Sequence, residues 1–386
     1  MTQKRLGICL VGTGFMGRAH SSAYRRISEF PRSGFEIGLQ SVVGQDEIRL
    51  KEMRGRYGWT NSSRDWMAEI RSPDVDVVDI ATPTDLHAGI ALAAAAAAKH
   101  VLCEKPLAMS AAEGEEMLAA ASAAGIRHAV AFNYRFVPAI ALARRLILEG
   151  RLGAIRHVRA HYLQDWLADA DAPMTWRLTR AAAGSGAHGD LNAHLIDLAH
   201  HLVGPIDEVV ADSRTFSSVR RWPSTGKVAE VTVDDATSFL ARFRCGAMGV
   251  FEASRAATGS KNRNQIEIEG SDGALRFDLE RLNELQFHSA ADAPDLRGFR
   301  TILVTEPQHP FLAHWWPPGH LLGWEHAHVH LIAAFLNDIV TGDCTAPTFE
   351  DGLACQRVLE ACERSVNERR WIATGFADPD RNEGCQ

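Results

Sequence analysis

Short apolar segments alternate with helix-forming segments over the first third of the chain. The apolar, β-rich segments are residues 6–11, 39–43, 75–80, 100–103 and 128–131. The helix-like stretches that follow them are residues 16–27, 47–57, 87–98 and 111–124. This alternation is typical of a parallel sheet with crossover helices. Residues 1–132 are therefore predicted to form one doubly wound α/β domain.

The remainder, residues 133–386, is predicted to form a second α/β domain that binds substrate and associates with other copies. Its strand-like segments are 209–216, 236–244, 248–253, 264–269, 274–279 and 284–287. Turn residues between them favour a large, mainly antiparallel, open-faced sheet. Helical patterns at 191–202, 327–338 and 351–367 are expected to cover one face of that sheet, which leaves the other for a homodimer or homotetramer. Residues 217–228 and 292–323 are expected to be long loops.

Composition narrows the class of ligand. The 386 residues carry a formal net charge of −7, which argues against binding to nucleic acid or to anionic lipid. No apolar run approaches the ~20 residues needed to span a bilayer. The N-terminus lacks a signal-peptide pattern, so we expect a cytoplasmic protein with a small-molecule ligand. The seven scattered cysteines are interpreted as free thiols.

A glycine motif follows the first predicted strand and opens the first predicted helix. It reads Gly12-Thr13-Gly14-Phe15-Met16-Gly17. Glycines there let the backbone approach a pyrophosphate, which the helix N-terminus attracts. The motif predicts that the first domain is a Rossmann domain that binds a dinucleotide.

The acidic residue that usually holds the adenosine ribose is missing from its normal place. The second strand ends Val43-Gly44-Gln45-Asp46, with Gly44 where an acid is expected. Asp46 either contacts the ribose or caps the helix that starts at Glu47, and the cap is slightly favoured. No arginine is nearby for a 2′-phosphate, so NAD is favoured and NADP is not excluded.

Polar residues gather where the next strands end. Thr82 and Pro83 follow one strand, His87 begins a helix, and Glu104 and Lys105 follow the next strand. Ligands bind at this carboxyl edge of open α/β sheets. A lysine there can take part in proton transfer near the nicotinamide, and the alternative is a surface salt bridge with Glu104.

A glycine-rich stretch in the second domain leads into an Asp/His pair. Asp190 and His194 are four residues apart, so a helix places them on one face, and Asp197 falls on the same side. Such a pair can orient an imidazole that accepts a proton from a substrate hydroxyl. Isolated Asp/His pairs are more often structural.

These motifs together resemble those of a known family. The glycine motif, Glu104-Lys105-Pro106, Asn133-Tyr134-Arg135 and Asp190-x-x-x-His194 occur in the order and at the spacing of the Gfo/Idh/MocA oxidoreductases. The resemblance covers nearly the whole chain. Segments such as Tyr162-Leu-Gln-Asp-Trp166 resemble the branch that contains levoglucosan dehydrogenase and some inositol dehydrogenases.

The resemblance implies roles for individual residues. Lys105, Asp190 and His194 would be the catalytic set, in which His194 or Lys105 accepts the hydroxyl proton and Asp190 orients them. The residues implied to bind the cofactor are Gly12, Gly14, Phe15, Met16, Gly17, Asp46, Thr82, Pro83, His87, Glu104, Lys105, Asn133, Trp176 and Arg177. Those implied to bind substrate are Lys105, Tyr134, Arg135, Gln164, His188, Asp190, Asn192 and His194. A cis peptide is implied before Pro106, and His188 and Asn192 depart from the family pattern.

Histidines at 326, 328 and 330 suggest a metal site at first sight. On a helix their spacing points the middle ring away from the other two, so no metal is expected.

Three functions fit these residues. The leading one is an NAD(P)-dependent dehydrogenase that oxidises a secondary alcohol of a pyranose, anhydrosugar or inositol. A redox-neutral, NAD-dependent glycosidase, which acts on a sulfoquinovoside for example, would use the same Lys105, Asp190 and His194. A non-enzymatic NAD sensor is the third, and the presence of all three residues argues against it.

Overall fold

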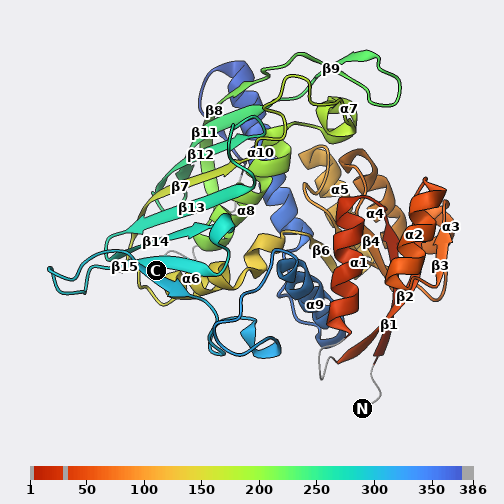
Figure 1. Cartoon of the computed structure of the whole chain (residues 1–386), viewed down its shortest axis with the longest axis horizontal. Coiled ribbons are helices and arrows are strands. Elements are labelled where there is room, and N and C mark those ends of the chain that lie inside the picture. The colour runs from red at the N-terminus through yellow and green to blue at the C-terminus, as the bar shows by residue number, and fades with distance from the viewer. Residues whose placement is uncertain (1–3, 29–33, 376–386) are drawn as a thin grey trace. The chain divides into compact units, whose positions relative to one another are not determined.

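Six parallel strands form the first sheet of the protein, whose computed structural model describes residues 4–28 and 34–375 (Figure 1). Their order across the sheet is β3-β2-β1-β4-β5-β6. The bounds are β1 (Lys4–Val11), β2 (Phe35–Val43), β3 (Asn61–Ser63), β4 (Val77–Ile80), β5 (His100–Cys103) and β6 (His128–Val130). The last six residues of β1 are all buried, as a central strand covered on both faces requires. The doubly wound parallel sheet is therefore confirmed.

Helices join these strands as the periodicity predicts. They are α1 (Phe15–Ile27), α2 (Glu47–Tyr57), α3 (Trp66–Ile70), α4 (His87–Ala96) and α5 (Ala111–Ala123). At the start of α2 the Asp46 carboxylate accepts hydrogen bonds from the backbone N–H groups of Ile48 and Arg49, at 3.0 and 3.1 Å. The favoured interpretation of Asp46 as a helix cap is confirmed.

A helix from late in the chain completes the first unit. This unit takes in the chain up to Asn133 and returns for Trp324–Leu353, which includes α9 (His326–Thr341). Helix α9 packs against α1. The expectation that helix 327–338 covers the second sheet is therefore wrong. An amphipathic pattern shows that one helix face is buried, but it does not identify the element that buries it.

The second unit is built on a nine-stranded sheet, with residues Tyr134–Gly323 and the described residues from Ala354 onward. The strand order is β16-β15-β14-β13-β7-β12-β11-β8-β17, and neighbours are antiparallel except for β7 and β12. The bounds are β7 (Ile155–Leu163), β8 (Ile206–Arg214), β11 (Ala236–Phe243), β12 (Met248–Ser254), β13 (Arg263–Gly270), β14 (Gly273–Asp278), β15 (Glu284–Ser289), β16 (Arg300–Leu303) and β17 (Ile372–Ala373). The mainly antiparallel sheet is confirmed.

Helices line one face of this sheet. Helix α6 (Pro138–Leu148) packs on β14 and β15, and α8 (Ala193–Leu202) packs on β7 (Figure 1). The remaining helices are the short α7 (Arg180–Ala183) and α10 (Phe349–Glu368). Along β11 buried and exposed residues alternate, which is typical of a sheet with one covered and one open face.

The two segments expected to be loops contain short strands. The first holds the hairpin of β9 (Val219–Arg221) and β10 (Val228–Glu230), and the second contributes β16 to the edge of the large sheet. The expectation of loops is wrong at these residues. Strands of three or four residues are too short to show the apolar alternation by which strands are recognised.

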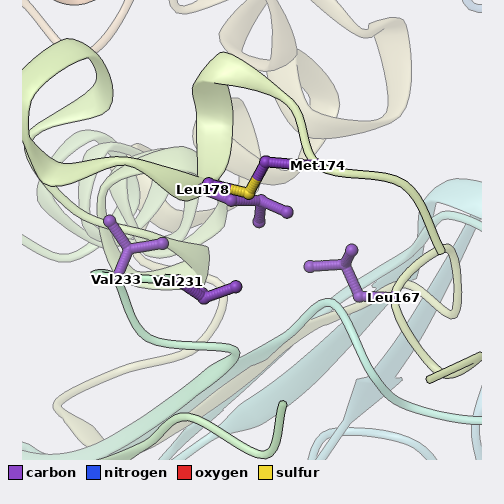
Figure 2. Close-up of a cluster of buried hydrophobic side chains, with 5 residues drawn as sticks. All are labelled: Leu167, Met174, Leu178, Val231 and Val233. Atoms are coloured by element: carbon purple, nitrogen blue, oxygen red, sulfur yellow. The ribbon is translucent and has the colours of Figure 1, made fainter. Parts of the chain in front are cut away.

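A small apolar cluster fastens the hairpin to the chain before α7. Figure 2 shows its five side chains, which are Leu167, Met174, Leu178, Val231 and Val233. Arg220 of β9 reinforces the cluster, because its guanidinium donates hydrogen bonds to backbone carbonyls between Leu167 and Ala172 at 2.9–3.4 Å. This segment is therefore folded on its own satellite core.

Buried charges lie beneath the first sheet's carboxyl edge. His20 of α1 has its Nδ1 2.9 Å from both carboxylate oxygens of Asp79 in β4, and its Nε2 3.1 Å from Glu104 Oε1. Tyr24 donates a hydrogen bond of 2.9 Å to Asp79. All four side chains are buried. An imidazolium at His20 compensates the two carboxylates.

The pKa shifts follow from this arrangement. Burial alone would lower the pKa of His20, but the charges of Asp79 and Glu104 outweigh it and raise that pKa to about 10. Burial opposes ionisation of Glu104, yet His20 lowers its pKa to about 2. Burial and the His20 charge lower the pKa of His328 on α9 to about 3. At neutral pH His20 is charged and His328 is neutral.

No helix within residues 4–28 and 34–375 has both the length and the apolar character needed to span a bilayer.

The satellite cluster gives a first prediction. Leu178→Ala removes a fully buried side chain and should lower the free energy of unfolding by roughly 2–5 kcal/mol. The control is Val228→Ala in the same hairpin, where the side chain is exposed and the change should stay within about 0.5 kcal/mol. Urea denaturation measures both, and equal effects would show that the cluster does not stabilise the fold.

The buried His20 cluster gives a second prediction. Because its folded pKa lies above the ordinary 6.5, His20 contributes stability that is complete below pH 6.5 and is lost as pH rises through about 10. Between these limits the free energy of unfolding should fall by about 1.4 kcal/mol per pH unit relative to His20→Asn. At neutral pH the variant should be less stable by roughly 3–5 kcal/mol, since two carboxylates stay buried.

Urea unfolding from pH 6 to pH 10 measures this slope. His320→Asn, at an exposed histidine, should keep the wild-type slope. Parallel pH profiles for the wild type and His20→Asn would show that His20 is not charged.

Candidate active site

The glycine motif forms a tight turn between β1 and α1. A Cβ on Gly12 would lie 2.2 Å from the backbone oxygen of Ala81, and one on Gly17 would lie 2.1 Å from the oxygen of Gly12. Gly12 also has φ +128°, which disfavours other residues. A Cβ on Gly14 would meet nothing within 4 Å, so the backbone at the N-terminus of α1 is open. These residues fit a dinucleotide whose pyrophosphate lies at this N-terminus.

The end of β2 has no side chain in the position of the usual acid. A Cβ on Gly44 would come within 2.7 Å of the Thr13 side chain, which fills that space. Gln45 donates to the carbonyl of Arg64, and Asp46 caps α2. No carboxylate therefore stands at the usual position, and a contact between Asp46 and the ribose stays a prediction.

The turns after β4 and β5 are joined by His87. Its buried ring has Nδ1 3.1 Å from the carbonyl oxygen of Pro106 and Nε2 3.2 Å from that of Thr82. The peptide between Lys105 and Pro106 is cis, which confirms the expectation. His87 therefore holds the backbone of the two turns in which Thr82, Pro83 and Lys105 lie.

Glu104 and Lys105 have different environments. Glu104 is buried beside His20, and its Oε2 accepts a hydrogen bond of 3.1 Å from the backbone N–H of Lys105. Glu104 is therefore a buried group, and the Lys105 charge adds to the effect of His20 in lowering its pKa. The His20 cluster fixes the backbone from which the Lys105 side chain projects.

Two further cofactor candidates contact α9 and the residues just before it. Phe15 is exposed on one side and stacks against Trp324, with ring centroids 5.4 Å apart. The Asn133 amide lies 3.2 Å from Nε2 of His328. These contacts explain why the returning segment belongs with the first unit.

In the second unit the glycine-rich stretch is tied to Asp234. Its carboxylate accepts hydrogen bonds from the backbone N–H groups of Gly186 and His188, at 2.7 and 2.8 Å. A Cβ on Gly186 would lie 1.7 Å from the Asp234 backbone oxygen, so only glycine fits. The stretch then enters a π-helical turn, His188–Asn192, which leads into α8. π-Helical turns of this kind often occur at functional sites.

Asp190 lies in this π-helical turn and is ion-paired. Its Oδ2 is 2.8 Å from a guanidinium nitrogen of Arg255, which follows β12. The Asp190 side chain is 28% exposed, whereas that of Arg255 is only 1% exposed. The structure thus adds a buried cation that the sequence analysis did not identify.

His194 starts α8 and is enclosed by two tyrosines. Its ring centroid is 4.6 Å from that of Tyr134 and 5.9 Å from that of Tyr162. Burial, followed by the Tyr134 hydroxyl, raises the pKa of Tyr162 well above its ordinary value, so this phenol is neutral. The two hydroxyl oxygens are 2.8 Å apart. The environment of His194 is aromatic and polar.

A chain of hydrogen bonds continues from these tyrosines. The Tyr162 hydroxyl and the Gln164 amide both donate to Asn262 Oδ1 at 2.8 Å, and the Trp166 indole donates to Gln164 Oε1 at 2.9 Å. Some side chains in this series of hydrogen bonds keep an exposed edge, such as Trp166 at 38% exposure, and such side chains are suited to binding a polyhydroxylated ligand.

Three of the substrate candidates make internal contacts. His188 and Asn192 are buried and bond to each other at 3.1 Å, and His188 also bonds to the carbonyl of Leu359 at 3.0 Å. Arg135 makes two hydrogen bonds of 3.0 Å to the carboxylate of Asp197 on α8. These contacts fix the π-helical turn and α8, and a direct role with substrate stays a prediction.

Trp176 and Arg177 form a pair on a short turn. The Arg177 guanidinium lies over the Trp176 ring, 4.5 Å from its centroid, and the Arg177 carbonyl accepts a hydrogen bond of 3.2 Å from Arg255. Their proposed place near the cofactor is likewise untested.

The histidines of α9 serve its packing. His328 faces His20, with ring centroids 5.6 Å apart. In the described part of the chain, no three or more His, Cys, Asp or Glu side chains are grouped to hold a metal ion.

The sequence analysis missed several residues that shape these sites. They are His20, Asp79, Asp234, Arg255 and Asn262, and Tyr162 and Trp166 were noted only as part of a segment that resembles the family. A histidine inside a helix or an arginine after a strand has no motif of its own. The Asp234-Asp235 pair at the start of a predicted strand was the one available signal, because carboxylates there often bind backbone N–H groups.

Family models match most of the chain. One, described as an oxidoreductase family with an NAD-binding Rossmann fold, matches residues 6–132. Another, the GFO/IDH/MocA C-terminal domain, matches residues 140–276. The expected NAD-binding Rossmann domain is therefore confirmed.

Relatives extend this match over nearly the full length. The levoglucosan dehydrogenase of Pseudarthrobacter phenanthrenivorans is 40% identical, over 96% of this chain and 98% of its own. An oxidoreductase domain protein from Kribbella flavida is similar in structure, with 50% identity, a TM-score of 0.93 and coverage of 96% and 99%. The structure of levoglucosan dehydrogenase in complex with NADH and levoglucosan gives 40% identity, a TM-score of 0.93 and coverage of 96% and 100%. The chain therefore belongs to the Gfo/Idh/MocA family of oxidoreductases.

Proposed function

We propose that this protein is an NAD-dependent dehydrogenase that oxidises a secondary alcohol carbon of levoglucosan or a closely similar pyranose. The observation that carries the proposal is the 40% identity to levoglucosan dehydrogenase over 96% of the chain. Lys105, Asp190 and His194, to which the resemblance to this family assigns the catalytic roles, are all present. The relatives reported above are oxidoreductases, and nothing among them favours the redox-neutral glycosidase.

In this proposal Lys105, Asp190 and His194 form the catalytic set. Lys105 or His194 accepts the proton of the hydroxyl that is oxidised. Both side chains are titratable, and each is attached to backbone that buried groups hold in place. Asp190 orients the set, and the Tyr134, Gln164 and Asn262 side chains contact the other hydroxyls of the sugar. The polar chain from Tyr162 to Trp166 supports this role.

NAD, when bound, supplies the acceptor for the hydride that leaves the carbinol carbon. We propose that Gly12, Gly14 and Gly17 hold its pyrophosphate at the N-terminus of α1, with Phe15, Met16, Thr82 and Pro83 around it. The open backbone at Gly14 supports this placement. Five further residues are proposed to contact the cofactor or to support residues that contact it: His87, Glu104, Asn133, Trp176 and Arg177.

The activity is tested by following NADH absorbance and substrate loss together. NAD⁺ is supplied with levoglucosan, free hexoses, inositols, aryl glycosides or sulfoquinovosides. We expect NADH to accumulate fastest with levoglucosan, in a one-to-one ratio with the sugar consumed. Cleavage of a glycoside without NADH would instead establish the redox-neutral hydrolase. NADH formation with inositols alone would refute the proposed substrate but keep the proposed reaction.

A variant of the catalytic lysine gives the third prediction. Lys105→Ala should abolish turnover while changing the Kd for NAD⁺ by no more than a few-fold, because it removes a proton-transfer group rather than the glycine turn. Turnover is followed by NADH absorbance, and NAD⁺ binding by calorimetry. Lys227→Ala, at an exposed lysine of the β9–β10 hairpin, is the control and should keep full activity. Parallel loss of turnover and NAD⁺ binding would contradict the catalytic role of Lys105.

We also infer that copies of this chain associate through the open face of the large sheet. Leu240 of β11 lies opposite Val250 of β12, Met248 lies on the same face, and all three are exposed. Apolar side chains clustered on one sheet face favour association.

The fourth prediction tests this face. Leu240→Asp should shift the particle mass measured by light scattering toward that of a single chain, because it introduces a charge into the interface. Leu148→Asp, at an exposed leucine of α6, is the matched control and should keep the wild-type mass. A wild-type chain that is already monomeric would overturn the inference.

A further inference from the structure

Arg255 is a deeply buried charged residue that contacts a proposed catalytic residue. One guanidinium nitrogen donates to Asp190 Oδ2 at 2.8 Å, and another donates to the Arg177 carbonyl at 3.2 Å. The Trp166 ring lies over the guanidinium carbon, with its centroid 5.3 Å away. The side chain is 1% exposed. An aromatic ring, a carbonyl and a carboxylate thus surround one cation.

The backbone of Arg255 is as firmly held as its side chain. It follows directly after β12, a central strand that pairs with β7 and β11. Its N–H donates to the Asp235 carbonyl and its own carbonyl accepts from Leu167, both at 2.9 Å. Burial among Trp166, the Arg177 carbonyl and Asp190 restricts the torsions of the side chain itself. Arg255 can therefore hold its partner in one position.

Burial makes this contact functionally different from a surface ion pair. An exposed pair contributes little, because water screens both charges. Here the cation is shielded from water, so the loss of either partner leaves an uncompensated charge. A cation so placed also favours the ionised form of a neighbouring carboxyl group.

We propose that Arg255 is a positioning residue that fixes Asp190 as an anion, so that Asp190 orients the catalytic set and does not itself accept the substrate proton. This inference rests on the proposed function, because it needs Asp190 to belong to the catalytic set. It leaves proton acceptance to His194 or Lys105, which are the only other members of that set.

Several other titratable groups face the π-helical turn that carries Asp190. Tyr162 of β7 is buried near Asp190, whose charge contributes to raising the Tyr162 pKa after burial and Tyr134. Asp234 binds the backbone at the start of the turn, and His188 and His194 lie on the same helical segment. Arg255 contacts the Asp190 carboxylate directly, with a guanidinium nitrogen 2.8 Å from Oδ2.

A second buried arginine of the same unit gives a matched control. Arg220 is 3% exposed, and its guanidinium also makes short hydrogen bonds, but these go to backbone carbonyls near the satellite cluster. Replacing either arginine removes buried hydrogen bonds and should destabilise the fold. Only replacement of Arg255 should change the behaviour of Asp190.

The experiment compares Arg255→Gln, Arg255→Lys and Arg220→Gln in the full chain with NAD⁺ and levoglucosan. We expect Arg255→Gln to lower kcat roughly 100-fold with little change in KM, because the reacting groups are misplaced rather than the sugar lost. The acid limb of kcat/KM should move to higher pH by about one unit, because a carboxylate without its cation is protonated more readily. Arg255→Lys should restore part of kcat and most of the acid limb. Arg220→Gln should keep the wild-type acid limb.

A double-mutant cycle with Asp190→Asn separates this role from a general loss of packing. If Arg255 acts through Asp190, adding Arg255→Gln to Asp190→Asn should lower kcat by no more than about twofold further. A full additional 100-fold loss, or an unchanged acid limb in Arg255→Gln, would overturn the proposal. If the Arg255→Gln chain does not fold, Arg255→Lys and Arg255→Met take its place. Wild-type kcat and a wild-type acid limb in both variants would overturn the proposal.

Failure of the proposed function would look different. If the wild type oxidises no sugar in the panel, the substrate assignment fails. The role of Arg255 is then tested by urea unfolding across acid pH. In the wild type the Asp190–Arg255 pair should add to the free energy of unfolding, and this contribution should disappear as pH falls and Asp190 is protonated. Arg255→Gln should lack the contribution. In the Asp190→Asn background, chains with and without Arg255→Gln should show the same pH dependence. Persistence of that difference in the Asp190→Asn background would overturn the proposal independently of activity.

Discussion

An ionised side chain can be buried in a protein only if an opposite charge and hydrogen bonds replace the water it loses. Each unit of this protein builds its candidate site on that constraint. In the first unit His20 bridges Asp79 and Glu104, and in the second Arg255 binds Asp190. Glu104 of the first cluster binds the backbone N–H of Lys105, and Arg255 holds the Asp190 side chain of the π-helical turn. Loss of one partner would therefore disturb both folding and chemistry.

The parallel sheet explains why the first of these clusters lies where it does. Strands β1, β4 and β5 end at the same edge, so the glycine turn, Thr82 and Glu104 are brought together although the sequence separates them by up to ninety or so residues. Helix α1 leaves the glycine turn and passes His20 beneath that edge. One helix thus serves two purposes, since its N-terminus attracts a pyrophosphate and its second turn carries the His20 cation that binds Asp79 and Glu104.

Much of this organisation could be predicted from the sequence, for identifiable reasons. Helices and strands with a regular apolar period were found within a few residues of their bounds, and the glycine motif and Lys105 were found because their chemistry depends on local order in the chain. The partner of α9, the hairpin at Val219 and the roles of His20 and Arg255 were not found. The hairpin was missed because its strands are too short to show an apolar period. The other features depend on which distant element a side chain meets, and a single sequence carries no signal for that contact. For Asp46 the sequence allowed two interpretations, a ribose contact and a helix cap, and the structure shows the cap.

The charge on Asp190 bears on how proton transfer can work. A carboxylate paired with a buried guanidinium is a poor proton acceptor, because protonating it would leave Arg255 without a counter-charge. The same pairing makes it a good orienting group, since its position does not need to change when substrate arrives. Preorganised charges of this kind cost little reorganisation during a reaction. In the proposed catalytic set, proton acceptance then falls to Lys105 or to His194, which Tyr134 and Tyr162 enclose one turn further along, while the Asp190–Arg255 pair stays fixed.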